Sequence, residues 1–117
     1  MARINRGDVV IARVPQGPGY KVRPVVIVQN DKNNARFTNT IVAIVTSNTR
    51  LASKEPTQVL IDIGTVEGKQ TGLALSSAVK CENLYTLPTG VLRKIGTMPG
   101  GLMRQVDDAL KASLALR

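Results

Sequence analysis

The chain has 117 residues, of which 43% are hydrophobic, and this is enough for one domain to bury a core. Aromatic residues make up only 3% and histidine is absent, which argues against nucleic-acid binding through aromatic stacking and against catalysis by an imidazole base. The formal charge is +8, and residues 1–54 hold nine cations against two anions. Such a charge favours a polyanionic partner, the alternative being a charge that only keeps the protein soluble.

Three strands are predicted in the first half of the chain. A Gly-Asp turn precedes a strand over 9–14, which ends at the short Pro/Gly-rich loop 15–19. A second strand covers 22–29 and, after a polar stretch, a third covers 40–46. The second and third strands contain unbroken apolar runs, which are typical of strands covered on both faces.

The sequence of the second half of the chain predicts further strands and then one helix. Residues 57–63 alternate between apolar and polar side chains, as a half-exposed strand does, and further strands are expected near 72–81 and 91–97. Over 102–114 apolar residues recur at helical spacing, at Leu102, Met103, Val106, Leu110 and Leu114, with Asp107 and Asp108 on the other side. This order predicts a mainly β domain over residues 1–117, a small antiparallel barrel or rolled sheet with a C-terminal helix.

Arg23 is the first candidate functional residue, because Pro24 and the apolar run Val25–Val28 follow it directly. Proline fixes its own φ and biases the residue before it toward an extended backbone, so the guanidinium is held at the mouth of a buried strand. A fixed group with five hydrogen-bond donors suits the recognition of a phosphate or carboxylate. The alternative is a surface cation or salt-bridge partner.

The sequence also limits which cellular compartment and which cofactors are expected. No segment has the roughly 18 to 20 continuous apolar residues of a membrane span, and the N-terminus lacks the apolar core of a signal peptide, so we expect a cytoplasmic protein with no membrane partner. Cys81 is the only cysteine, which excludes an internal disulfide. Without histidine it forms neither a Cys–His dyad nor a conventional zinc site, and we interpret it as a small buried thiol.

Six blocks of sequence, in order and over nearly the whole chain, resemble the MazF/PemK toxins of bacterial toxin–antitoxin modules: Arg6–Val9, Arg23–Asp31, Ala43–Ser47, Pro56–Thr57, Cys81–Asn83 and Val106–Leu114. The resemblance implies a small SH3-like barrel of the MazF/PemK-like and CcdB-like group that acts as a homodimer. It also implies an mRNA interferase, which is a metal-independent and cofactor-free endoribonuclease. Such an enzyme cuts single-stranded RNA, mainly mRNA, at short motifs, leaves 2′,3′-cyclic phosphate and 5′-hydroxyl ends, and arrests growth.

The resemblance assigns the family's catalytic arginine to Arg23 and its catalytic threonine to Thr46. When a ribose 2′-oxygen attacks the adjacent phosphorus, a guanidinium and a hydroxyl stabilise the growing charge. Because the pKa of a guanidinium lies above ~12, Arg23 is not expected to accept the proton, and the acceptor is left open. Thr46 by itself is ordinary, since a threonine that ends a strand is usually satisfied by local backbone hydrogen bonds.

Four further residues are candidate RNA contacts. Lys21, Ser47 and Arg50 neighbour the two matched positions, and lysine and arginine there would mainly position phosphates. Glu82 is a candidate base or base-reading acceptor, and its alternative is a structural or interface carboxylate.

The chain departs from its relatives after Glu82 and in the loop 15–21, so the cut motif cannot be carried over. The His–Asp mechanism proposed for some relatives does not apply either, because the chain has no histidine. The family also implies an acidic antitoxin whose partly disordered segment lies across the RNA groove. Two other functions keep the same barrel without needing Arg23 and Thr46 together: a DNA gyrase inhibitor and a noncatalytic RNA-binding protein.

Overall fold

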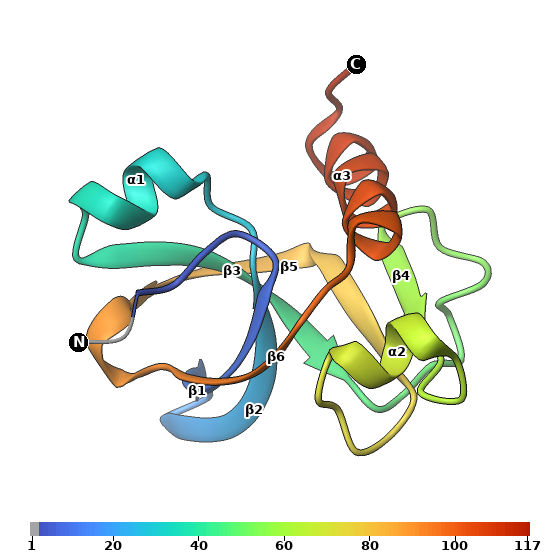
Figure 1. Ribbon diagram of the computed structural model, residues 1–117, viewed down its shortest axis with the longest axis horizontal. Coiled ribbons are helices and arrows are strands. Elements are labelled where there is room, and N and C mark those ends of the chain that lie inside the picture. Colours follow the sequence, from blue (N-terminus) through green and yellow to red (C-terminus); the bar gives the residue numbers. More distant parts are fainter. Residues whose placement is uncertain (1–2) are drawn as a thin grey trace.

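The computed structural model describes residues 3–117 and contains a six-stranded sheet in which every neighbouring pair of strands is antiparallel. The strand order is β4-β5-β3-β2-β1-β6, so β4 and β6 form the two edges, and the sheet curls strongly (Figure 1). The strands are β1 (Asp8–Gln16), β2 (Gly19–Ile27), β3 (Asn39–Thr46), β4 (Gln58–Ile61), β5 (Ser77–Pro88) and β6 (Arg93–Thr97). The mainly β fold with a C-terminal helix is thereby confirmed.

The middle of β2 and β3 is covered on both faces of the sheet. Val42 and Ile44 of β3 belong to one buried cluster, whereas Ala43 and Val45 belong to a second cluster on the opposite face. On β2 the buried residues Val25–Ile27 alternate between the same two clusters. This confirms the expectation from the unbroken apolar runs, because successive side chains of a strand point to opposite faces.

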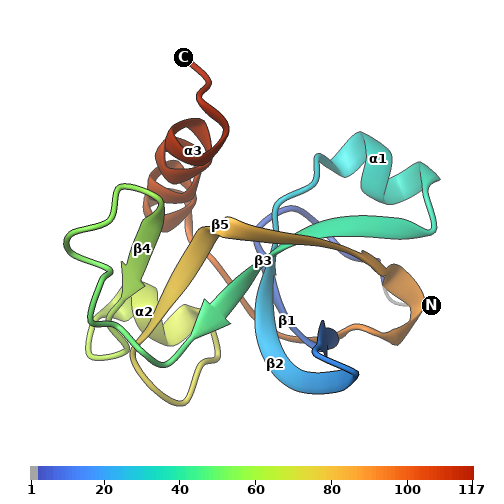
Figure 2. The same cartoon turned by 180° about the vertical axis from the view of Figure 1, so that it is seen from behind.

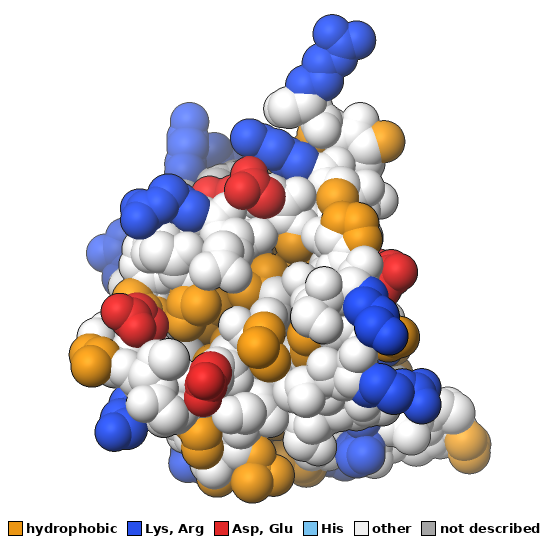
Figure 3. Space-filling model, turned by 90° about the vertical axis from the view of Figure 1, so that its right-hand side faces the viewer, with side chains coloured by type: hydrophobic (Ala, Val, Ile, Leu, Met, Phe, Trp, Pro, Cys, Tyr) orange, Lys and Arg blue, Asp and Glu red, His pale blue; other side chains and the backbone are white. Residues whose placement is uncertain are grey.

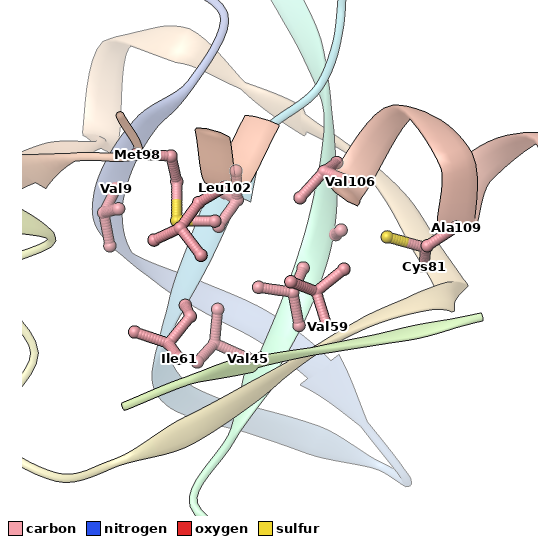
Figure 4. Packing of buried hydrophobic residues seen from close by; sticks show 12 residues of the cluster. Val9, Val45, Val59, Ile61, Cys81, Met98, Leu102, Val106 and Ala109 are labelled. Atoms are coloured by element: carbon pink, nitrogen blue, oxygen red, sulfur yellow. The ribbon is translucent and has the colours of Figure 1, made fainter. Parts of the chain in front are cut away.

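Helix α3 (Gly100–Leu114) packs against the second cluster, as predicted from its apolar spacing. Leu102, Val106 and Ala109 are buried and face the sheet residues of that cluster (Figure 4). The prediction was wrong for Leu114, whose side chain is 52% exposed, because the last turn of α3 extends past the sheet. Among residues 3–117, no helix is both long and apolar enough to cross a membrane.

Arg6 links the N-terminal segment to α3 and to the end of β2. Its Nε donates to the carbonyl oxygen of Val28 (2.8 Å), and its Nη2 pairs with a carboxylate oxygen of Asp107 (2.7 Å). The backbone N–H of Arg6 donates to Asp31 (2.6 Å), at the start of α1 (Asp31–Arg36). The ion pair of Arg6 with Asp107 therefore ties α3 to the N-terminal segment, and the hydrogen bond to Asp31 ties the start of α1 to the same segment.

Two connections differ from the sequence predictions. The expected loop 15–19 is a hairpin in which β1 and β2 stay paired up to Gln16 and Gly19. Only Gly17 and Pro18 connect them, and Gly17 has a φ of +56°, which suits the first central position of a two-residue turn. The polar stretch before β3 contains the helix α1, which was missed because it buries no residue and so shows no apolar periodicity.

The strand expected near 72–81 lies later in the chain. It is β5 (Ser77–Pro88), and the short helix α2 (Val66–Gln70) precedes it. The pairing of β3 with β5 shifts register: Ala43 lies opposite Leu84, but Ile44 lies opposite Lys80. The intervening residues 81–83 form an irregularity in β5, so the strand has no single alternating pattern from which its length could be read.

Gly96 of β6 allows a close backbone approach and gives a test of the packing. A Cβ atom at Gly96 would clash with the backbone of Thr71 at the end of α2, whereas a Cβ atom at Gly90 would meet open space. Gly96→Ala is expected to lower the free energy of unfolding by roughly 1–3 kcal/mol, measured by urea denaturation. Gly90→Ala is the control, expected to change it by less than about 0.5 kcal/mol. Equal effects of the two substitutions would contradict the packing.

Candidate active site

The pairing of β2 with β3 ends at Val25 and Ile44. The next residue of β2 is Pro24, which has no N–H to donate to a neighbouring strand. Beyond this last pair the two strands separate, and Arg23 and Thr46 each lie two residues past it on their own strand. The two residues that the sequence singled out therefore flank the point where the strands separate, and both line one pocket.

A pocket of about 320 Å³ lies at this separation. Figure 2 shows the end of β3 diverging from β2 toward the segment that precedes β5. Apolar lining comes from Val22, Pro24, Val45 and residues 73–75, and the polar or charged lining residues are Lys21, Arg23, Thr46, Ser47 and Ser77. Two of the lining residues are cations and none is a carboxylate, so the lining carries a net positive charge.

Arg23 is half-buried, and among residues 3–117 no carboxylate pairs with its guanidinium. The salt bridges of the described chain join Arg6 to Asp107 and Lys94 to Asp8. The alternative of a salt-bridge partner therefore finds no support for Arg23. A half-buried guanidinium that keeps its donors for a ligand binds phosphate more strongly than a fully solvated one does.

Thr46 accepts a hydrogen bond on its hydroxyl oxygen from the backbone N–H of Asn48 (3.1 Å). This contact orients the hydroxyl and leaves its own proton to donate. The local hydrogen bond expected of a strand-ending threonine is thus present, and it is compatible with a role toward a ligand.

The other candidate residues differ in whether they line this pocket. Lys21 is exposed and lines the pocket together with Ser47. Arg50 does not line this pocket: it is exposed in the turn after β3, and its backbone N–H donates to the side-chain oxygen of Asn48 (3.1 Å).

Glu82 is not brought together with Arg23 and Thr46. Its two carboxylate oxygens accept from the hydroxyl of Thr57 (3.2 Å) and from Nε2 of Gln58 (2.9 Å). These contacts tie β5 to the start of β4, and they favour a structural carboxylate at this position.

Sequence reasoning missed Lys80, Asn83 and Tyr85. Lys80 and Asn83 lie at the register shift of β5, and all three line a second pocket of about 370 Å³ on the other side of Arg23. Lys80 also lines a hollow of about 70 Å³ beside Thr46. The only signal in the sequence was that residues 83–88 depart from the family pattern.

Cys81 lies in the buried cluster beneath α3, so it is the buried thiol that the sequence predicted. Burial first, and then the nearby Glu82 carboxylate, raise the pKa of Cys81 from 9.0 to about 12, while Arg6 acts in the opposite direction. Among residues 3–117, no three His, Cys, Asp or Glu side chains are grouped to hold a metal ion.

We expect Cys81 to resist alkylation by iodoacetamide at pH 8.5 in the folded protein and to react quickly in urea, because only the thiolate is nucleophilic. The pKa of Cys81 is higher in the folded protein than in the unfolded protein. The protonated thiol therefore contributes stability that is fully present below pH 9 and is lost as the pH rises toward 12. Urea denaturation of Cys81→Ala, the control, should lack that part of the pH dependence. Rapid labelling of the folded protein would contradict the burial.

A curled antiparallel sheet with a terminal helix, and a pocket lined by Arg23 and Thr46 where two strands separate, define a small β domain with a positively charged candidate site. Residues 5–114 match the family described as the PemK-like, MazF-like toxin of type II toxin–antitoxin systems, and the chain belongs to this family. It is 36% identical over 117 residues to the Endoribonuclease EndoA of Bacillus subtilis (strain 168), covering 97% of this chain and 96% of that protein.

Two solved structures share the fold. The Mycobacterium tuberculosis toxin MazF-mt6 is 27% identical with a TM-score of 0.76, covering 94% of this chain and 98% of the toxin chain. An endoribonuclease from Mycobacterial species, solved in complex with its cognate antitoxin, is 24% identical with a TM-score of 0.78, covering 97% of both chains. The similarity extends over almost the full length of each chain, so it includes both ends of the curled sheet.

Proposed function

We propose that this protein is the toxin of a type II toxin–antitoxin system and acts as a sequence-specific, metal-independent endoribonuclease on single-stranded RNA, mainly mRNA. The observation that carries the proposal is that Arg23 and Thr46 line one pocket where β2 and β3 separate, with no carboxylate in the lining to neutralise the arginine. The 36% identity to a protein named Endoribonuclease EndoA supports the same activity. Cleavage of mRNA would inhibit translation and arrest growth.

In the proposed reaction the ribose 2′-oxygen attacks the adjacent phosphorus, and the bond from phosphorus to the 5′-oxygen breaks. The products are a 2′,3′-cyclic phosphate and a 5′-hydroxyl. Negative charge grows on the non-bridging oxygens, where the donors of Arg23 and the hydroxyl of Thr46 stabilise it. The 2′-hydroxyl gives up its proton as it attacks and the leaving 5′-oxygen takes up a proton, so the transesterification balances without consuming water.

The remaining candidates take supporting roles in this proposal. Lys21 and Ser47 line the pocket of Arg23 and contact the sugar–phosphate backbone that passes it. Arg50 contacts the RNA beyond the pocket, from the exposed turn after β3. Glu82 keeps β4 against β5 through Thr57 and Gln58 and so supports the wall that carries Lys80.

We also propose an acidic antitoxin that covers the same groove. The charge of +8 and the carboxylate-free pocket suit a disordered acidic segment that folds on binding. Among the relatives, a Mycobacterial endoribonuclease has been solved with its cognate antitoxin. Binding across Arg23 would block RNA by occupying the anion site directly.

A homodimer is part of the proposal as well. On the face formed by β4, α2 and α3, hydrophobic side chains gather in a hollow (Figure 3). The exposed large hydrophobic residues of these elements are Leu60, Val66 and Leu114. Such a patch is typical of a protein–protein interface, and we assign it to a second copy of the chain.

Arg23→Ala and Thr46→Val are each expected to slow RNA cleavage by roughly 100- to 1000-fold, because each removes a donor to the developing charge. Thr46→Ser keeps the hydroxyl and should retain most of the rate, and Arg36→Ala on α1 is the charge-matched control. The measurement uses a long unstructured RNA with EDTA, maps the cuts, and identifies the end groups. Thermal unfolding of each variant verifies its folding.

Intact RNA with a folded wild-type protein would refute the nuclease. Inhibition of DNA gyrase in a supercoiling assay would then favour the gyrase inhibitor, and a gel shift with RNA alone would favour the noncatalytic RNA-binding protein. Cleavage that survives Arg23→Ala would place the chemistry elsewhere on the molecule.

Lys21→Ala tests the proposed phosphate contact. It should weaken binding to single-stranded RNA for all sequences alike and reduce the slope of log K against log salt by about 0.7, because one fewer phosphate is neutralised. The motif that is cut should stay the same. Lys32→Ala, an exposed cation at the start of α1, is the control and should leave the slope unchanged. An altered cut motif in Lys21→Ala would show base reading instead.

A further inference from the structure

The pocket of about 370 Å³ on the far side of Arg23 has no role in the proposed reaction. It lies between the β1–β2 hairpin and the register shift of β5, and Arg23 lines both this pocket and the one beside Thr46. A group bound here is therefore next to whatever anion Arg23 holds. This continuity links the pocket to the nucleotide that carries the scissile phosphate.

The exposed lining of the pocket is mainly polar, with one aromatic ring. Gln16 and Asn83 supply carboxamides, the half-buried Tyr85 supplies the ring, and Val14 and Ile44 line the pocket but are almost fully buried. Lys80 lines it too, and none of its lining residues is a carboxylate. A heteroaromatic ring with donors and acceptors on its edge, attached to an anionic backbone, matches this chemistry, and a nucleobase of RNA is such a group.

Asn83 owes its position to the irregularity in β5. The residues 81–83 come between the pairs Ala43–Leu84 and Ile44–Lys80, so they have no partner on β3. Asn83 lies two residues before Tyr85, and the two side chains line the same pocket.

The carboxamide of Asn83 also differs from its neighbour in having unused hydrogen-bonding groups. Glu82 is occupied by Thr57 and Gln58, whereas no side-chain hydrogen bond among residues 3–117 involves Asn83. The carboxamide offers one acceptor and two donor hydrogens to a ligand. It is the group in this pocket best suited to distinguish one base edge from another.

We propose that this pocket is a nucleobase subsite for the nucleotide adjoining the scissile phosphate, and that Asn83 is its specificity-determining residue. The inference rests on the proposed function. The ring of Tyr85 contacts one face of the base, and the Asn83 carboxamide hydrogen-bonds its edge. Lys80, which also lines the hollow beside Thr46, holds the backbone between the base and the reacting phosphate.

The test compares wild type, Asn83→Asp and Asn83→Leu on an RNA pool with a randomised segment, with the cut ends sequenced. Asn83→Leu should lower kcat/KM for the preferred base at one position adjoining the cut by about 10- to 100-fold and leave the other positions unchanged. Asn83→Asp, which only accepts hydrogen bonds when ionised, should shift the preference at that position toward bases that present a donor. Asn33→Asp and Asn33→Leu on α1 are matched controls without effect.

A binding measurement separates failure of this inference from failure of the proposed function. The same variants are used to select bound sequences from a randomised 2′-O-methyl RNA pool, which cannot be cleaved. Unchanged base preference in both folded Asn83 variants would overturn the inference while leaving the nuclease intact. A wild type that binds without cutting, with a preference that Asn83 variants alter, would support the subsite and refute the nuclease. A wild type that neither binds nor cuts would overturn both.

Discussion

The rest of the structure depends on the burial of β3 on both of its faces. Val42 and Ile44 pack in one buried cluster, and Ala43 and Val45 pack in the other, which α3 covers. A strand fixed from both sides cannot slip in register, because a shift of one residue would exchange its two buried faces. Thr46, the last residue of β3, is therefore held at a defined place at the edge of the core.

The site exists because pairing stops beside this rigid core. Val25 still pairs with Ile44, but Pro24 has no N–H to continue the ladder, and beyond it the strands separate around a pocket. Arg23 and Thr46 flank that pocket close to the buried residues Val25 and Val45 of their strands, so their backbone positions are set before any ligand arrives. Preorganised donors that need not move during the reaction are what stabilise a developing charge most effectively.

The register shift in β5 places Lys80 and Asn83 in the lining of the second pocket. It releases residues 81–83 from pairing with β3 and directs neighbouring side chains to different surroundings: Cys81 into the core, Glu82 to Thr57 and Gln58, and Asn83 into the second pocket. Two of the three residues that sequence reasoning missed, Lys80 and Asn83, lie here. An irregular strand has no single period to read, and the contacts of Glu82 depend on where β4 lies, so neither was predictable from local sequence.

The sequence by itself determined the class of fold, the two strands with covered faces, the helix that ends the chain, and the candidate pair Arg23 and Thr46. Each of these followed from a local pattern: an unbroken apolar run, helical spacing, a proline after an arginine, and family blocks in order. Only the tertiary structure decided that the pair lines one pocket between separating strands, that Arg23 lacks a carboxylate partner within residues 3–117, and that Glu82 bonds to Gln58. Those outcomes depend on the register between distant strands, and register is set by the packing of the whole sheet.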